Sequence, residues 1–323
     1  MSISAAFMVT AILLTVFLVI VLRGFNSLSK DGMPLAGGIA IGVALIVTSM
    51  YYWTPAWLMP SQMQGILIAS GVMLLFGFVD DIKELSVVGK LIVQLAAVAI
   101  LILCGVRTHI VYIGTTLNIL ITVIWVLGIT NAINLLDVMD GLAGSVALMV
   151  SLAFCVIASI NGDAANAVLA CGIAASVSGF LIFNLPPARL YMGNAGSHFL
   201  GFLFASMAIS IHYASLEAKL ALMAPILILG FPIFDTLFLI FMRVRKGRSA
   251  FNKSNDHLAL RFLKAGYSKQ AALLIMVLVA SVFVVSGIAM FKLPGVYVFI
   301  PPAIVVVLSI FLSKRMSRVV IDG

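Results

Sequence analysis

The sequence has very little charge. Only 9% of its 323 residues are Asp, Glu, Lys or Arg, whereas 63% are hydrophobic and the mean hydropathy is +1.24. Soluble domains carry roughly a quarter charged residues, so this composition excludes a soluble fold. A helix that crosses a bilayer needs about 20 apolar residues, and segments of that length use up almost the whole chain. We therefore predict an all-α, polytopic integral membrane protein in which residues 1–323 form a single transmembrane domain.

Residues that form disulfides or zinc sites are also scarce. The three cysteines, Cys104, Cys155 and Cys171, lie in apolar segments without CxxC spacing, which favours packing residues over disulfides or metal ligands. The four histidines form no HxxxH pair, so we expect no zinc site built on thiolates or imidazoles. No convincing internal repeat is present either, unlike the paired repeats of many secondary transporters.

Apolar segments predict about eleven membrane spans. They lie near residues 3–22, 36–52, 63–79, 88–104, 117–136, 142–160, 164–184, 197–213, 219–241, 270–290 and 294–313. No basic residue precedes the first segment, and Arg23 follows it, which predicts an uncleaved first helix with its N-terminus outside.

The distribution of basic residues agrees with this count. Alternation places six segments in the cytoplasm, the last of which is the C-terminus: 23–35, 80–87, 137–141, 185–196, 242–269 and 314–323. All of the 19 Lys and Arg residues except Arg107, Lys219 and Lys292 lie in these segments or at the flanking helix ends, as the positive-inside rule requires. The net charge of +8 therefore indicates orientation in a membrane and not a nucleic-acid partner. Residues 107–118 could form a small external hairpin.

Two groups of polar residues interrupt the apolar pattern on the cytoplasmic side. Asp80 and Asp81 end an apolar helix, where the helix dipole disfavours carboxylates, so a lysine or a divalent metal should compensate them. Asn134, Asp137 and Asp140 recur every three residues and would share one face if the segment is helical. Such groups cost roughly 2.5–3.5 kcal/mol each at a bilayer centre and are usually functional. The alternatives are a solvated helix end and an ordinary loop.

Residues 183–202 and the basic segment 242–270 complete this face. Gly193 and Gly196 permit a tight backbone, and Ser197 is expected as the N-cap of the next helix. The free amides of that helix start could bind a phosphate, or the segment could be a simple cap. The basic segment could contact anionic lipids or close over a substrate.

Acids, amides, cations and a glycine-rich turn on one face are suited to metal-assisted phosphoryl transfer. Mg²⁺, or Mn²⁺ in its place, is the expected cofactor, because Mg²⁺ prefers oxygen ligands and bridges substrate phosphates.

Four segments resemble a known family in order and spacing: FGFVDDIKEL, NAINLLDVMDGLAG, NLPPARLYMGNAGSHFLG and PIFDTLFLIFMRVRKGRSAF. They are similar to the polyprenyl-phosphate N-acetylhexosamine-1-phosphate transferases of glycosyltransferase family 4. The chain resembles the branch that transfers GlcNAc-1-phosphate to undecaprenyl phosphate more than the phospho-MurNAc-pentapeptide translocase. The resemblance implies that a polyprenyl phosphate attacks a UDP-N-acetyl sugar and releases UMP. This would be the first membrane step of a cell-surface polysaccharide pathway, in the bacterial inner membrane.

The resemblance also implies roles for individual residues. Asp80 would deprotonate or orient the lipid phosphate, and Asp81 would support the metal or the phosphates. The implied catalytic residues are Asp80, Asp81, Asp137 and Asp140. The implied substrate-binding residues are Lys30, Lys90, Asn131, Gly193, Ser197, His257 and Arg261. The implied metal ligands are Asn134, Asn194 and Asp81.

Three departures from the family pattern leave alternatives open. Asn194 stands where the family has a metal-binding Asp, and Ala259 and Leu260 stand where histidines are usual. Val138 and Met139 replace a typical Gly-Leu. A neutral amide binds Mg²⁺ more weakly, so a non-catalytic relative that binds UDP-sugar or polyprenyl phosphate is the main alternative. A secondary transporter is a third hypothesis, and a second copy of the chain, as a homodimer, is a candidate partner.

Overall fold

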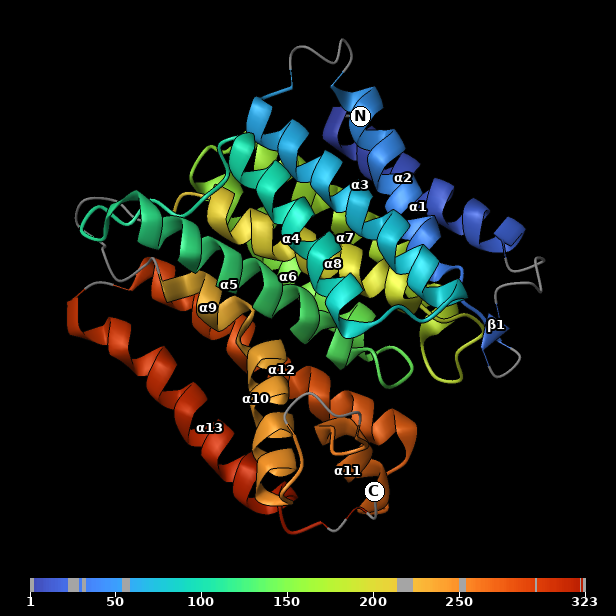
Figure 1. The fold of residues 1–323 in the computed structure, drawn as a ribbon, viewed down its shortest axis with the longest axis vertical. Helices are drawn as coiled ribbons and strands as arrows, with labels where there is room; N and C mark the ends of the chain where they lie inside the picture. Colours follow the sequence, from blue (N-terminus) through green and yellow to red (C-terminus); the bar gives the residue numbers. More distant parts are fainter. Residues whose placement is uncertain are drawn as a thin grey trace.

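The computed structural model describes residues 3–22, 29–30, 33–53, 59–213, 223–249, 254–293, 295–319 and 321 (Figure 1). The longer helices of this part are α1 (Ile3–Leu22), α2 (Gly37–Tyr52), α3 (Ser61–Ile82), α4 (Val87–Leu103), α5 (Gly114–Leu136), α6 (Leu142–Ile160), α7 (Ala164–Asn184), α8 (Gly193–Ser210), α10 (Gly230–Arg245), α12 (Lys269–Lys292) and α13 (Ile300–Met316). Shorter elements are the helices α9 (Ala224–Ile228), α11 (Leu258–Lys264) and η3 (Gly295–Phe299), and the strands β1 (Ser29–Lys30) and β2 (Met33–Pro34). The all-α prediction is confirmed.

The helices coincide with the apolar segments of the sequence. Six segments are long and apolar enough to cross a membrane: α3, α5, α6, α7, α12 and Gly295–Met316. The protein is therefore a polytopic membrane protein. The ninth expected span, 219–241, is divided into α9 and α10. Pro232 lies in the first turn of α10 and has no N–H to donate to the carbonyl of Ile228, which weakens the connection between the two helices.

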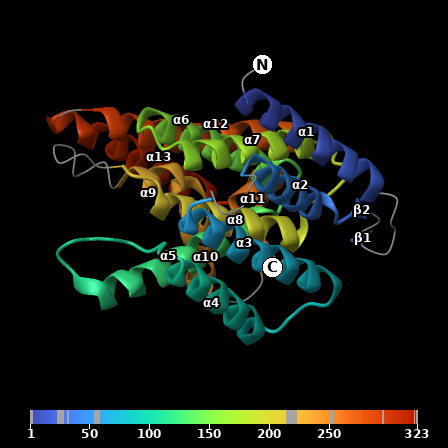
Figure 2. The same ribbon diagram turned by 90° about the horizontal axis from the view of Figure 1, so that it is seen from above.

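The helix α8 occupies the centre of the bundle. Every residue from Ala195 to Ala208 is buried, as expected for a helix that is apolar on all sides. In Figure 2, α1, α6, α7 and α12 lie on one side of the molecule, α4 and α5 on the other, and α3 and α8 between them. The helix α8 thus holds its first turn against neighbours on several sides.

Glycines permit the start of α8 to lie directly against α2 and α3. A Cβ atom added to Gly77 of α3 would lie 2.6 Å from the Cα of Ala195, and one added to Gly38 of α2 would lie 2.6 Å from the carbonyl of Met192. The same segment is bonded to α2, since the Gly38 N–H donates to the Met192 carbonyl at 2.9 Å. Gly38 of α2 and Gly77 of α3 therefore allow both helices to pack against the backbone at the start of α8.

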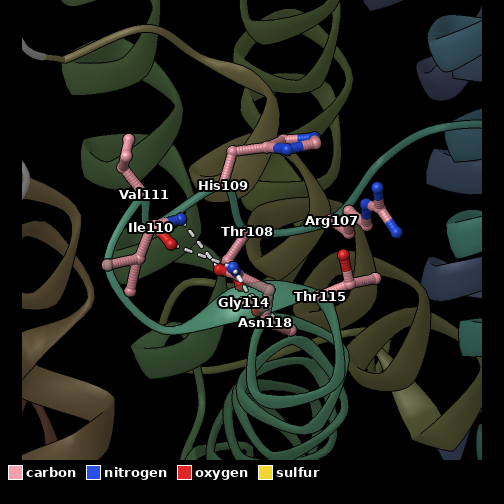
Figure 3. A pocket seen from close by; sticks show the side chains of 8 residues that line it. All are labelled: Arg107, Thr108, His109, Ile110, Val111, Gly114, Thr115 and Asn118. Carbon is pink, nitrogen blue, oxygen red and sulfur yellow. Dashed lines mark hydrogen bonds between the residues drawn. The ribbon is translucent and has the colours of Figure 1, made fainter.

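The hairpin expected at residues 107–118 is wrong. The second half of that segment is the first turn of α5, and within the described residues β1 and β2 are the only strands. The side chain of Asn118 explains the difference. Its Oδ1 accepts from the Ile110 N–H at 2.8 Å, and its Nδ2 donates to the Ile110 carbonyl at 3.0 Å (Figure 3). A side-chain amide thus replaces the partner strand.

We predict that Gly77→Ala strongly destabilises the protein, whereas Gly71→Ala on the same helix does not. A Cβ at position 77 collides with the backbone of α8, whereas one at position 71 meets only the Cδ1 of Ile46 at 3.9 Å. Overpacking of this kind costs about 1–3 kcal/mol. Thermal unfolding followed by fluorescence-detected size exclusion measures the effect. Equal midpoints for both variants would show that α3 and α8 are not this close.

Candidate active site

The carboxylate of Asp81 accepts hydrogen bonds from the start of α8. Its Oδ1 lies 2.8 Å from the N–H of Asn194, and its Oδ2 lies 3.0 Å from the N–H of Ala195. A negative charge is favourable at a helix N-terminus, where the backbone N–H groups lack partners within the helix. Asp81, near the end of α3, thus supplies the cap of α8 from 113 residues away in the sequence.

The expectation that Ser197 is the N-cap is therefore wrong. The helix begins four residues earlier, at Gly193, and its N-cap position, Met192, makes no side-chain cap hydrogen bond. Gly193 has a φ of +72°, and a Cβ there would lie 2.6 Å from Oδ2 of Asp81. Positive φ and the close carboxylate both favour glycine at this position.

Asn194 is joined to α5 by its side chain. The Nδ2 of Asn134 donates to the Oδ1 of Asn194 at 3.0 Å and to the Oγ of Ser197 at 2.9 Å. Ser197 in turn donates to the carbonyl of Gly193 at 3.0 Å. These residues therefore form one hydrogen-bonded group with Asp81, which joins the ends of α3, α5 and α8.

Asp80, the neighbouring carboxylate, has different partners. It is 3% exposed, its Oδ2 lies 2.6 Å from the Nζ of Lys90, and its Oδ1 accepts from the N–H of Leu85 at 2.8 Å. Ser86 caps α4 by accepting from the N–H of Gly89, which sets the register that brings Lys90 to the ion pair. Lys90 therefore compensates Asp80, whereas Asp81 is compensated by the start of α8.

Asn131 pairs with a residue that we did not predict. The Nδ2 of Asn131 donates to the Oε1 of Gln94 at 3.1 Å, and the Nε2 of Gln94 approaches the Oδ1 of Asn131 at 3.4 Å. Gln94 lies one helical turn after Lys90 on α4. Its spacing from this predicted phosphate-binding lysine is the sequence feature that could have identified it.

We expected Asn134, Asp137 and Asp140 to share one helical face, but only Asn134 lies within the helix. The helix α5 stops at Leu136, and Asp137 is its C-cap residue. Asp140 lies in the following turn, where its Oδ2 is 3.3 Å from the Nζ of Lys269 and 3.4 Å from the N–H of Ala188. Asp140 therefore ties the turn to α12 and to the segment before α8.

Asn184 is a second residue that the sequence did not indicate. At the end of α7, its Oδ1 accepts from the N–H of Gly141 at 3.0 Å and its Nδ2 donates to the carbonyl of Leu190 at 2.8 Å. It joins the two segments that carry the predicted catalytic and glycine-rich motifs. Its position directly before Leu185-Pro186-Pro187 at a helix end was the only local signal.

His257 and Arg261 lie in a separate network and not beside Asp81. The Nδ1 of His257 is 3.5 Å from the Oδ2 of Asp235. Arg261 is fully buried, with its Nη2 at 2.5 Å from the Oδ1 of Asp256 and its Nη1 at 3.0 Å from the carbonyl of Met316. The guanidinium therefore fixes the end of α13 and can reach a substrate only if this network opens.

Asp256 connects that network to α10. Burial raises the pKa of its carboxyl, but the hydrogen bond and charge of Lys246 and the charge of Arg261 outweigh burial and lower the pKa below its usual value of 3.8. A carboxyl whose pKa is lowered by folding stabilises the protein at pH values above its unfolded-state pKa. This stabilisation is lost as the pH falls through the folded-state pKa. The network therefore remains intact at neutral pH.

The oxygen atoms around Asn194 are of the kind that could hold Mg²⁺. Within the described residues, no three His, Cys, Asp or Glu side chains are placed to hold a metal ion. The available donors are the carboxylate of Asp81, the amide oxygens of Asn134 and Asn194, and the hydroxyl of Ser197. Mg²⁺ usually binds through one or two carboxylates and takes its other ligands from water and substrate phosphates. The backbone of Lys30 lies in β1, and its side chain is outside the described part.

Comparison with known proteins shows the family of the chain. Residues 63–212 match glycosyl transferase family 4. The chain is 30% identical over 268 residues to a probable undecaprenyl-phosphate N-acetylglucosaminyl 1-phosphate transferase of Bacillus subtilis, covering 80% of this chain and 73% of the relative. It is 30% identical over 278 residues to the decaprenyl-phosphate N-acetylglucosaminephosphotransferase of Mycobacterium leprae, covering 76% and 70%.

A third relative acts on a different sugar. The phospho-N-acetylmuramoyl-pentapeptide-transferase of Shouchella clausii is 29% identical over 287 residues, covering 80% of this chain and 83% of the relative. The matched region contains Asp80, Asp81, Asn134 and Asn194, which the structure brings together at one end of the bundle. The chain is thus a membrane-embedded member of glycosyl transferase family 4, whose named relatives are phosphotransferases.

Proposed function

We propose that the protein transfers an N-acetylhexosamine 1-phosphate from a UDP-sugar to a polyprenyl phosphate, such as undecaprenyl phosphate, and releases UMP. One structural observation is the main support for this proposal. The Asp80–Lys90 ion pair and the group formed by Asp81, Asn134 and Asn194 meet at one end of an otherwise apolar bundle. This end offers both a cation and carboxylates to two phosphate-bearing substrates, one of which is a lipid.

The contacts of Asp80 and Lys90 support their roles. Asp80 is held by Lys90 and by the Leu85 N–H, so its carboxylate has a fixed orientation from which it can accept the proton of a lipid phosphate. The Lys90 side chain is 27% exposed and can offer its remaining N–H groups to phosphate oxygens. Asp137 would act beside them at the end of α5.

The remaining site residues would bind and orient the substrates. We propose that four further residues contact the substrates, because they lie on or next to the segments that form this end of the bundle: Lys30, Asn131, Gly193 and Ser197. We propose that Asp140, His257 and Arg261 act on the site by holding its flanking loops.

Asn134, Asn194 and Asp81 would hold Mg²⁺, or Mn²⁺ in its place, together with substrate phosphates. When bound, the ion would neutralise the diphosphate and stabilise the charge that develops on the leaving UMP. Because Asn194 is neutral, this chain would rely on the phosphates for more of the metal's affinity than a protein with Asp at that position.

The proposed orientation follows from charge. Eleven spans, with the N-terminus outside and the C-terminus in the cytoplasm, would place the site on the cytoplasmic side of a bacterial inner membrane, where nucleotide sugars are available. The product would enter a cell-surface polysaccharide pathway at its first membrane step. A homodimer is compatible with the proposal and is not required by it.

A non-catalytic role is the second candidate function. The neutral Asn194 and the substitution of Ala259 and Leu260 for histidines favour it, because both remove groups that could contact a metal or phosphates. In that case the same site would bind UDP-sugar or polyprenyl phosphate without transfer.

We predict that Asp80→Asn and Asp137→Asn each lower UMP release by about a hundredfold or more, the typical contribution of a proton-transfer group. The assay uses the purified protein, undecaprenyl phosphate, UDP-GlcNAc and Mg²⁺. Asp163→Asn is the matched control, because Asp163 caps α7 at the opposite end of the bundle and Asn keeps an oxygen that can accept from the Asn166 N–H.

Two results would count against the proposal. Full activity of Asp80→Asn and Asp137→Asn would exclude these carboxylates from the chemistry. If the unaltered protein binds polyprenyl phosphate but releases no UMP from any of a panel of UDP-sugars, the non-catalytic function is correct.

We predict that Asn194→Asp tightens divalent-metal binding by roughly tenfold, since it adds a charge where the oxygen already faces the site. The variant keeps an oxygen that can accept from Asn134, so the fold is preserved. Mn²⁺ binding in the presence of UMP, followed by electron paramagnetic resonance, measures the change. Asn131→Asp adds the same charge beside Gln94 and should have a smaller effect. Unchanged Mn²⁺ affinity in Asn194→Asp would remove Asn194 from the metal site.

A further inference from the structure

A basic pocket lies at the end of the bundle opposite the candidate active site. Asn134 is near the C-terminal end of α5, and the pocket is at the N-terminal end of this 23-residue helix, about 30 Å away along its axis. The pocket has a volume of about 250 Å³ and is formed by residues 107–111 and the first turns of α5 (Figure 3). None of its residues belongs to the transfer site.

Two basic side chains and a hydroxyl lie on the same side of this loop. Figure 3 shows the guanidinium of Arg107, the imidazole of His109 and the hydroxyl of Thr115 on one side, and Ile110 and Val111 on the other. Within the described residues, Arg107 forms no ion pair and no side-chain hydrogen bond. Arginine is rare on the face expected to lie outside, and the Arg107 guanidinium is available there to an anionic ligand.

The loop is fixed before any ligand binds. The N–H of Thr108 donates to the Oγ1 of Thr122 at 2.9 Å, and the Oγ1 of Thr108 donates to the Asn118 carbonyl at 2.8 Å. Asn118 also holds both backbone groups of Ile110. Because Asn118 and Thr122 are buried, the loop position is set by α5, and little ordering free energy remains to be lost on binding.

The surroundings of the pocket are apolar and exposed. Leu103, Val111 and Tyr112 are 87%, 87% and 89% exposed. In a membrane protein such side chains face lipid, and tyrosine is enriched where the hydrocarbon meets the head groups. The pocket therefore combines an anion-binding side with a surface suited to acyl chains.

We propose that this pocket binds the phosphate group of an anionic phospholipid. Arg107 donates charge-assisted hydrogen bonds to the phosphate oxygens, and its planar guanidinium can engage two oxygens at once. His109 and Thr115 donate further hydrogen bonds, and the acyl chains lie along the exposed ends of α4 and α5. The site is independent of the proposed transferase activity.

Native mass spectrometry of the full chain in detergent, titrated with phosphatidylglycerol or phosphatidylcholine, tests the proposal. We expect phosphatidylglycerol to bind more tightly, and Arg107→Gln to weaken its binding about tenfold, a change of about 1.4 kcal/mol. His109→Gln should weaken binding less, and Arg107→Lys should retain part of it. Lys292→Gln is the control, because Lys292 is an exposed basic residue at the same end of the bundle but outside the pocket.

Three results would overturn the assignment. Equal phosphatidylglycerol binding by Arg107→Gln, Arg107→Lys and the unaltered protein would exclude this pocket. An equal loss in Lys292→Gln would indicate diffuse charge attraction. Inorganic phosphate that stabilises the protein against heat through Arg107, with no further effect of phosphatidylglycerol, would assign the pocket to free phosphate and not to a lipid.

Discussion

The contact on which the rest of the site depends is the carboxylate of Asp81 against the first N–H groups of α8. It places a negative charge where the helix dipole is positive, and it does so between two helices that are remote in the sequence. The contact requires backbone proximity, which Gly77 provides on α3 and Gly193 provides at the turn. With α8 fixed in this way, the side chain of Asn194 faces Asn134 of α5. The hydrogen bonds of Asp81, together with those of Asn134, therefore hold three polar helix ends next to one another in an apolar bundle.

The same contact explains the glycine-rich sequence at residues 193–196. The free amides of a helix start are often an anion site for a ligand. Here the protein supplies its own anion, the carboxylate of Asp81. Asp80 has no such capping role. Its buried carboxylate is compensated by Lys90, and an ion pair of this kind is costly to bury unless both partners are held in place. Such a cost is common at functional sites in membrane proteins.

The sequence was sufficient to predict the helices, because hydropathy is a local property. It also singled out Asp81, Asn134 and Asn194, which the structure joins by hydrogen bonds. It was not sufficient to predict the cap of α8. A hydroxyl such as Ser197 is the usual local candidate, whereas the actual acceptor, Asp81, comes from another helix. Arg261 shows the same limit. Its spacing matched a substrate-binding motif, but its partners, Asp256 and the carbonyl of Met316, depend on how α13 packs. Asn184 and Gln94 were not predicted, since each acts through a partner more than 30 residues away.

We propose that the diphosphate of the nucleotide sugar binds at the polar end formed by α3, α4, α5 and α8. A cryo-electron microscopy structure with UDP-GlcNAc and Mg²⁺ would locate it. We expect the diphosphate between Lys90 and the amides of Asn134 and Asn194, with Asp81 still bound to the start of α8. A nucleotide sugar bound at any other part of the protein, or an Asp81 carboxylate withdrawn from α8, would show that this end is not the binding site.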